Sequence, residues 1–222
     1  MAKRQTIALV AFLLSVALVS GAQAAGTKLA LPLDGSNARL GESTLGDLVA
    51  DAARTALNAD IALVQAGELR PSTIPAGDLG EGALGKALMY PEEQLVLVVM
   101  PGNTLQEALE RSLFLLPQPN PGFLQVSGMT VTFRSGAPAG RRLVSATIGG
   151  QALDPDKTYL TAMPVSLAKG AMGYFRVFAS LKTKPGSPSP AIGAAVTAYL
   201  QANRTISIIP GRRIVDLTKA SK

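Results

Sequence analysis

The chain contains no histidine, no cysteine and no tryptophan, and only 5% of its 222 residues are aromatic. Without histidine, Ser-His-Asp and Cys-His catalytic triads, histidine-rich metal centres and a histidine general acid are all excluded. Without cysteine, no disulfide can form, so the apolar core alone must hold the fold. Only carboxylates and other oxygen atoms remain as metal ligands, and no acidic loop of the EF-hand type is present. We therefore expect no cofactor and no metal centre.

Residues 1–24 have the pattern of a secretory signal peptide. Lys3 and Arg4 precede an uncharged run from Ile7 to Val19, and small residues follow, ending in Ala-Gln-Ala. A positive end, an apolar stretch of about 13 residues and an A-x-A site predict cleavage after residue 24. A retained membrane anchor is the less favoured alternative, because a spanning helix needs about 20 apolar residues. We expect the mature chain, 25–222, to be periplasmic or secreted and not held in the membrane.

The charge balance is mildly basic. The formal net charge is +6, and it falls to +4 when Lys3 and Arg4 leave with the signal peptide. Such a surplus suits an anionic ligand or partner. No basic stripe with interleaved aromatic residues is present, so we do not expect a nucleic-acid polymer as a partner.

The apolar patterns predict a single α/β domain of the α+β type, with mixed β-sheets packed with helices. Capping boxes are expected at Thr44 with Asp47 and at Thr104 with Glu107. Helices are expected from Thr44 to Asn58, from Thr104 to Leu116 and after Pro190, and strands at 61–64, 94–100, 129–133, 141–148 and 158–163.

The segment GFLQVSGMTVTF, residues 122–133, is the most informative stretch. Its second half alternates apolar and polar residues with the period of a half-buried strand. Its first half places Phe123 directly after a turn rich in proline and glycine. An aromatic ring at such a position can fill the core, or it can stack on a planar ligand. Both interpretations of Phe123 are open at this point.

The turn Gln65–Arg70 ends a short apolar strand. In α/β proteins, ligands tend to bind at the turns that follow such strands. The fork-shaped guanidinium of Arg70 is suited to a phosphate or a carboxylate. This turn is therefore a second candidate for ligand binding.

The order of motifs from residue 29 to about residue 217 resembles the C-terminal domain of the 5'-nucleotidase family, which includes periplasmic UDP-sugar hydrolases and ecto-5'-nucleotidases. The resemblance implies a substrate-specificity domain whose catalytic partner, a metallophosphoesterase domain with two metals and a histidine dyad, is missing here. The motifs are LDGSNARLGESTLGDLVADAAR (33–54), DIALVQAGELR (60–70), LVLVVMPGNTLQEALERS (95–112), GFLQVSGMTVTF (122–133), GGQALDPDKTYLTA (149–162), LAKGAMGY (167–174) and PGRRI (210–214).

The resemblance implies that a nucleoside base is held between two aromatic rings, which correspond here to Phe123 and Tyr174. Stacking of this kind contributes about 1–3 kcal/mol per base and tolerates different bases. The alternative is that both rings belong to the core or its rim.

Several polar positions of the family's site are altered. The NGGGIR-type turn corresponds to Gln65–Arg70, which keeps Gly67 and Arg70 but adds Glu68 beside the expected phosphate position. The family's arginine before the first-motif glutamate is replaced by Gly41, and Arg39 lies two residues earlier. The GGDGY motif has become GAMGY and has lost its acidic residue.

Three functions are compatible with these features. The first is an exported nucleoside- or nucleotide-binding module that works with a separate metallophosphoesterase chain in nucleotide catabolism. The second is a structural or protein-interaction relic in which nucleotide binding is lost. The third, an autonomous phosphatase, is disfavoured because no histidine-based metal centre can form, so hydrolase activity would be a property of the family rather than of this chain alone.

Overall fold

The computed structural model describes residues 26–80 and 82–218. The expected signal peptide lies outside these residues. The helices are α1 (Thr44–Ala56), α2 (Ala83–Ala87), α3 (Gly102–Leu113), α4 (Val165–Ala168) and α5 (Ile192–Ala202), with short 3-10 turns η1 (Ala66–Glu68) and η2 (Ala171–Gly173).

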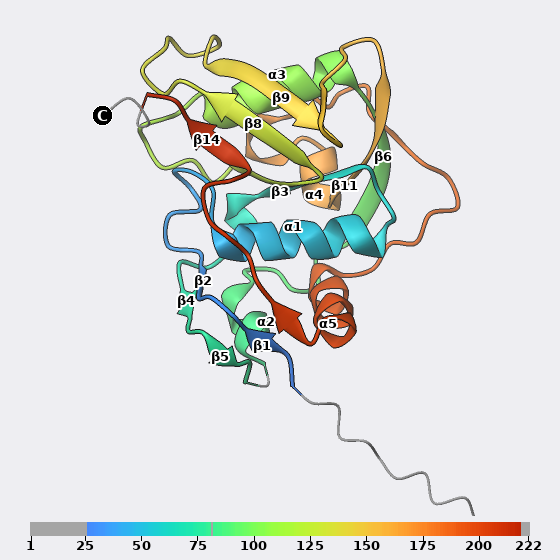
Figure 1. Cartoon of the computed structure of the whole chain (residues 1–222). Coiled ribbons are helices and arrows are strands. Elements are labelled where there is room, and N and C mark those ends of the chain that lie inside the picture. Colours follow the sequence, from blue (N-terminus) through green and yellow to red (C-terminus); the bar gives the residue numbers. More distant parts are fainter. Residues whose placement is uncertain (1–25, 81, 219–222) are drawn as a thin grey trace, which may run out of the picture.

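A five-stranded mixed sheet forms the middle of the molecule (Figure 1). Strands β11 and β3 pair in parallel, and the other neighbours are antiparallel. Helix α1 packs against β3 and β7 with one face and against α5 with another. In sheet order the strands are β12 (Lys182–Thr183), β6 (Leu95–Pro101), β11 (Thr158–Pro164), β3 (Ile61–Gln65) and β7 (Leu124–Ser127).

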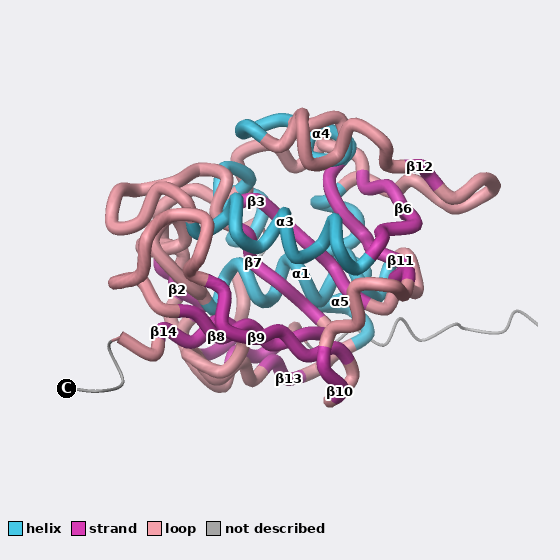
Figure 2. The backbone as a smooth tube through the Cα atoms, turned by 90° about the horizontal axis from the view of Figure 1, so that it is seen from above, coloured by secondary structure: helices cyan, strands magenta, loops and turns pink. Residues whose placement is uncertain are grey.

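A four-stranded sheet lies on the side of the five-stranded sheet away from α5 (Figures 1 and 2). The expected hairpin is present as β8 with β9, and the apolar residues of β8 are buried whereas its two threonines are not. Two small sheets complete the fold. The four-stranded order is β10 (Gln151–Ala152), β9 (Leu143–Ile148), β8 (Met129–Phe133) and β14 (Ile214–Asp216); the small sheets are β13 (Thr205–Ile206), β1 (Lys28–Leu29) and β5 (Gly77–Asp78), and β2 (Leu33–Asp34) with β4 (Thr73–Ile74).

Both expected capping boxes are wrong. The N-cap of α1 is Ser43, whose hydroxyl accepts a hydrogen bond from the Gly46 N–H at 3.0 Å. Asp47 does not complete a box, because neither of its buried carboxyl oxygens has a hydrogen-bond partner among the described residues. Helix α3 begins at Gly102, two residues earlier than expected, and no side chain caps it. In both helices the apolar stripe was read correctly and the first turn was not.

Glu42 and Arg213 fasten the C-terminal segment to α1. The Glu42 carboxylate accepts hydrogen bonds from the backbone N–H groups of Arg212, Arg213 and Ile214 at 3.1, 2.8 and 2.6 Å. The Arg213 guanidinium forms a bidentate pair with Asp51, with both N–O distances 2.8 Å. We call these contacts the C-terminal clasp.

Asp47 lies beneath this clasp with no exposed surface. Its nearest guanidinium atom, Nε of Arg213, is 3.6 Å away, and Arg213 is already paired with Asp51. Burial raises the pKa of Asp47 to about 8, and the neighbouring Glu42 and Asp51 carboxylates act in the same direction, against the opposing effect of Arg213. The carboxyl of Asp47 therefore stays protonated at neutral pH.

We expect thermal stability to fall between about pH 5.5 and about pH 8.5. Unfolded aspartate ionises near pH 3.9, whereas folded Asp47 holds its proton until about pH 8. Between these values the native state binds more protons than the unfolded state, so raising the pH favours unfolding. Calorimetric melting should show a midpoint several degrees lower at the higher pH, because each kcal/mol of lost stability lowers the midpoint of a domain of this size by about 2–4 °C. The slope should be shallower in Asp47→Asn and unchanged in the control Asp78→Asn, and equal slopes in all three proteins would mean that folded Asp47 is ionised.

Candidate functional site

Two of the turns expected at the site are joined through their backbones. Strand β3 ends at Gln65, and η1 follows at once. The Ala66 N–H donates to the Phe123 carbonyl at 2.8 Å, and the Gly67 N–H donates to the Pro121 carbonyl at 2.7 Å. The Gln65–Arg70 turn therefore lies beside the turn that leads into β7.

The third expected turn, which contains η2, lies on the same two segments. A Cβ atom built on Gly67 would lie 3.4 Å from Met172 Cε, and one built on Gly122 would lie 3.1 Å from Met172 Cβ. The Tyr174 hydroxyl donates to the Gly122 carbonyl at 2.7 Å. The fold thus brings together Gly67, Phe123 and Tyr174 from segments that are far apart in the sequence.

The rings of Phe123 and Tyr174 are both fully buried. Phe123 lines a small internal cavity with Leu109 of α3 and Val131 of β8. Tyr174 stacks on Phe178, with ring centroids 5.1 Å apart. In this conformation both aromatics occupy core positions, and neither offers a face to a ligand in solvent.

The Tyr174 hydroxyl lies in a dry environment. Burial raises the pKa of Tyr174 well above its ordinary value, while Ser112 and Arg111 oppose the shift. The tyrosine is therefore neutral and acts as a hydrogen-bond donor to Gly122.

Gln65 and Glu68 form a buried polar pair at the end of β3. Gln65 Nε2 donates to Glu68 Oε1 at 2.6 Å and lies 3.2 Å from the Ser166 hydroxyl. Burial raises the pKa of Glu68 to about 7, and the nearby Glu93 carboxylate adds to the shift. Gln65 Oε1 and Glu68 Oε2 are buried without a hydrogen-bond partner within the described part of the chain. The negative charge expected at Glu68 is thus largely suppressed below pH 7.

The two arginines predicted for the site differ in placement. Arg70 is exposed, and its Nε donates to the Leu88 carbonyl at 3.1 Å. Arg39 is half-buried, and its carbonyl accepts from the Asn120 N–H at 2.8 Å. Its Nε is buried without a partner among the described residues. Arg39 therefore adjoins the turn before Phe123, and Arg70 is the more exposed of the two cations.

Sequence reasoning missed Arg111 and Asn120. Asn120 is buried and ties its turn together: its Nδ2 donates to the Ser112 carbonyl at 2.7 Å, and its Oδ1 accepts from the Gly122 N–H at 2.9 Å. Arg111 Nε donates to the Gly173 carbonyl and Nη2 to the Met172 carbonyl, each at 3.1 Å. Arg111 lies off the apolar stripe of α3, so periodicity gave no signal for it. Asn120 could have been noticed as an asparagine in a proline-rich turn.

A family model described as 5'-nucleotidase, C-terminal domain, matches residues 21–180. The chain belongs to this family. An apyrase of Anopheles gambiae is 33% identical over 163 residues, which are 69% of this chain and 28% of the apyrase. The resemblance read from the motifs and the predicted α/β fold with mixed sheets are both confirmed.

Solved structures agree with this family assignment. A 5'-nucleotidase precursor from Thermus thermophilus superposes with a TM-score of 0.74 and 26% identity, over 88% of this chain and 40% of the nucleotidase. A sulfate thiohydrolase from the same species has a TM-score of 0.67 and 21% identity, over 86% of this chain and 34% of its own, which shows a shared fold alone. The chain therefore spans less than half the length of these relatives.

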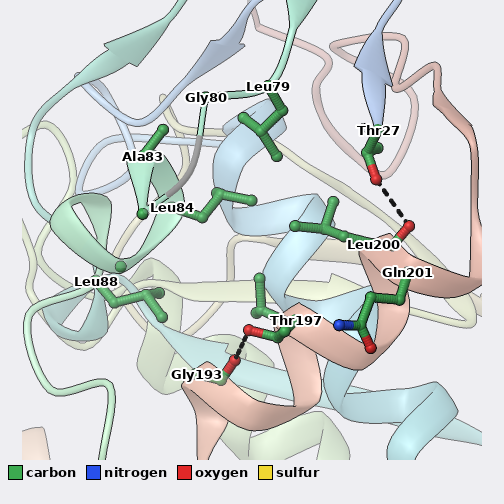
Figure 3. Close-up of a pocket in the computed structure, with 13 residues that line it drawn as sticks. Thr27, Leu79, Gly80, Ala83, Leu84, Leu88, Gly193, Thr197, Leu200 and Gln201 are labelled. Atoms are coloured by element: carbon green, nitrogen blue, oxygen red, sulfur yellow. Dashed lines mark hydrogen bonds between the residues drawn. The ribbon is translucent and has the colours of Figure 1, made fainter. Parts of the chain in front are cut away.

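The 5'-nucleotidase C-terminal domain also carries an apolar groove of about 380 Å³ between α2 and α5 (Figure 3). Leu84, Leu88 and Leu200 line it, and the glycines at 80, 82 and 85 leave open space where a Cβ would stand. The rim hydroxyl of Thr27 donates to the Leu200 carbonyl at 2.8 Å, so it is already bonded. The glycines at 80, 82 and 85 thus border an apolar surface.

No metal centre is apparent in residues 26–80 and 82–218, where no three histidine, cysteine, aspartate or glutamate side chains are grouped as metal ligands would be. None of the helices in these same ranges has the length and apolar character needed to cross a membrane.

Proposed function

We propose that this chain provides an exported recognition domain for a nucleoside or nucleotide. The observation that carries the proposal is the meeting of three turns at the end of β3, which places Gly67, Phe123 and Tyr174 together. Aromatic rings supply stacking energy for a base, and the exposed guanidinium of Arg70 supplies a donor array for an anion. Gln65 would add an amide to a base edge.

Catalysis would come from outside this domain. The domain lacks histidine and spans 28% of the apyrase and 40% of the 5'-nucleotidase to which it is similar. A separate metallophosphoesterase would supply the metals and the hydrolytic chemistry, and this domain would supply the substrate recognition. Both proteins would meet in the periplasm or outside the cell, to which the signal-like residues 1–24 would direct this one.

Isothermal titration above pH 7, where Glu68 is mostly ionised, should show that AMP binds about 5–10-fold more tightly than adenosine. A hydrogen bond to a charged group contributes about 1.5–3 kcal/mol, and the Glu68 carboxylate offsets part of it. Arg70→Gln should remove this difference and leave the adenosine affinity unchanged. Arg134→Gln, a change at an exposed arginine on the β8–β9 hairpin, is the matched control. If neither ligand gives heat at concentrations up to about 1 mM, the nucleotide proposal fails.

A second candidate function is protein interaction, with nucleotide binding lost. The apolar groove between α2 and α5 favours it, because exposed apolar grooves are typical docking sites for an amphipathic helix of another chain. The buried rings of Phe123 and Tyr174 also agree with this alternative. The titration separates the two functions, since an interaction relic would bind neither AMP nor adenosine.

A further inference from the structure

The turn from Gly170 to Tyr174 has an unusual backbone. Met172 adopts φ 56° and ψ 26°, in the left-handed region. Within the described ranges, Asn58 is the only other non-glycine residue with a positive φ, and asparagine tolerates this conformation better than methionine does. Gly170 and Gly173 flank Met172 with φ values of 91° and 86°. The turn is therefore strained at its centre and contains two glycines, which adopt positive φ without strain.

Met172 covers the point where the other two turns meet. Its side chain lies where a Cβ on Gly67 or Gly122 would point, and the residue is 41% exposed. Beneath it, Gly122 is bonded to the Tyr174 hydroxyl and precedes Phe123. A ligand that approached these two rings from solvent would meet Met172 first.

Arg111 holds the turn closed. Its two hydrogen bonds reach the carbonyls of Met172 and Gly173, and its guanidinium carbon lies 5.7 Å from the Tyr174 ring centroid and 6.0 Å from that of Phe114. A Cβ on Gly173 would collide with this guanidinium, so the glycine is needed for the contact. Arg111 Nη1 is buried with no hydrogen-bond partner in the described part of the chain. A buried donor without a partner costs free energy. The contacts of Arg111 therefore stabilise the closed turn less than they would if Nη1 were also hydrogen-bonded.

We propose that the Gly170–Tyr174 turn is a flap, latched by Arg111, that must lift before a nucleobase can reach Phe123 and Tyr174. The choice of nucleobase rests on the function proposed above, whereas the flap rests on the contacts of Arg111 and Met172. When only a fraction of molecules is open, the apparent affinity of the ligand falls by that fraction. Loosening the latch therefore exposes the rings and speeds ligand association.

Nitration of tyrosines by tetranitromethane, mapped by mass spectrometry, tests the flap without any ligand. Tyr174 is buried and hydrogen-bonded, whereas Tyr90 is 58% exposed and serves as the internal reference. In Arg111→Ala, nitration of Tyr174 should rise at least about tenfold relative to Tyr90, as expected for a tenfold larger open population. Arg176→Ala is the matched control, because this cation stacks on Phe175 next to the turn and makes no bond to it among the described residues.

Arg111→Lys keeps the charge and the stem but loses the planar fork, so it should give an intermediate rate even if Arg111→Ala folds poorly. Stopped-flow binding of adenosine then tests the ligand. Faster nitration together with faster adenosine association supports both the flap and the nucleobase. Faster nitration with no adenosine binding supports the flap and rejects the proposed function. Tyr174 nitration at the wild-type rate in both Arg111 variants, or as fast as Tyr90 in the wild type, overturns the flap.

Discussion

Arg213→Leu should lower the free energy of unfolding by about 3 kcal/mol, at the lower end of the cost of breaking a buried ion pair, because the Arg213–Asp51 pair is only partly buried. The guanidinium is the bidentate partner of Asp51 and also donates to the Val126 carbonyl at 3.1 Å. Without it, the Asp51 carboxylate keeps only its bond with Ser127, at 2.5 Å, among the described residues. Urea denaturation followed by circular dichroism measures the change.

Arg212→Ala is the control for this variant. Arg212 is exposed, and its contact with Glu42 is made by its backbone N–H, which alanine retains. The stability of this control should stay within about 0.5 kcal/mol of the wild type, as is usual for surface substitutions. If both arginine variants lose the same stability, net charge rather than the clasp accounts for the effect.

Phe123→Ala should lower the free energy of unfolding by about 3–5 kcal/mol, the usual cost of removing a buried aromatic ring. The ring has no exposed surface and packs among residues of α3 and β8. A ring that served only as a ligand platform would cost far less to remove. Chemical denaturation without nucleotide measures the difference directly.

Phe175→Ala is the matched control for Phe123→Ala, because this ring is 63% exposed. Its removal should change stability by no more than about 0.5 kcal/mol. A loss below about 1 kcal/mol in Phe123→Ala would show that the closed packing of the ring is a minor state in solution. Such a result would also require Phe123 to be accessible to a base without movement of the flap.

The elements that the sequence predicted well are those whose pattern is local. The alternation in 129–133 depends on one buried face, and the hairpin that it predicted is present as β8 and β9. The helix caps were predicted less well. Asp47 matches a capping position, but its carboxyl lies in the core beside Arg213, more than 150 residues away. The pattern of neighbouring residues in a sequence cannot indicate a contact between residues so far apart.

The candidate site was predictable as a set of segments but not as a geometry. The motifs around Gly67, Phe123 and Tyr174 were recognised, and the fold brings all three together. The direction of the Phe123 ring depends on how α3 packs against the ring. The sequence of the turn alone therefore left open whether Phe123 is buried or faces a ligand. Arg111 was missed because a half-exposed arginine on a helix usually faces solvent, and its carbonyl partners lie more than 60 residues away.

The C-terminal clasp also determines which parts of β8 are available to other molecules. Strand β14 pairs in parallel with β8, matching Ile214, Val215 and Asp216 to Val131, Thr132 and Phe133. Without β14, β8 would become an uncharged edge strand of high β-propensity with open hydrogen-bonding groups. Edges of this kind recruit strands from other molecules and promote aggregation. Glu42 and Arg213 hold residues 212–214, and with them β14, in place. They thereby protect the four-stranded sheet from pairing with a second copy of the chain.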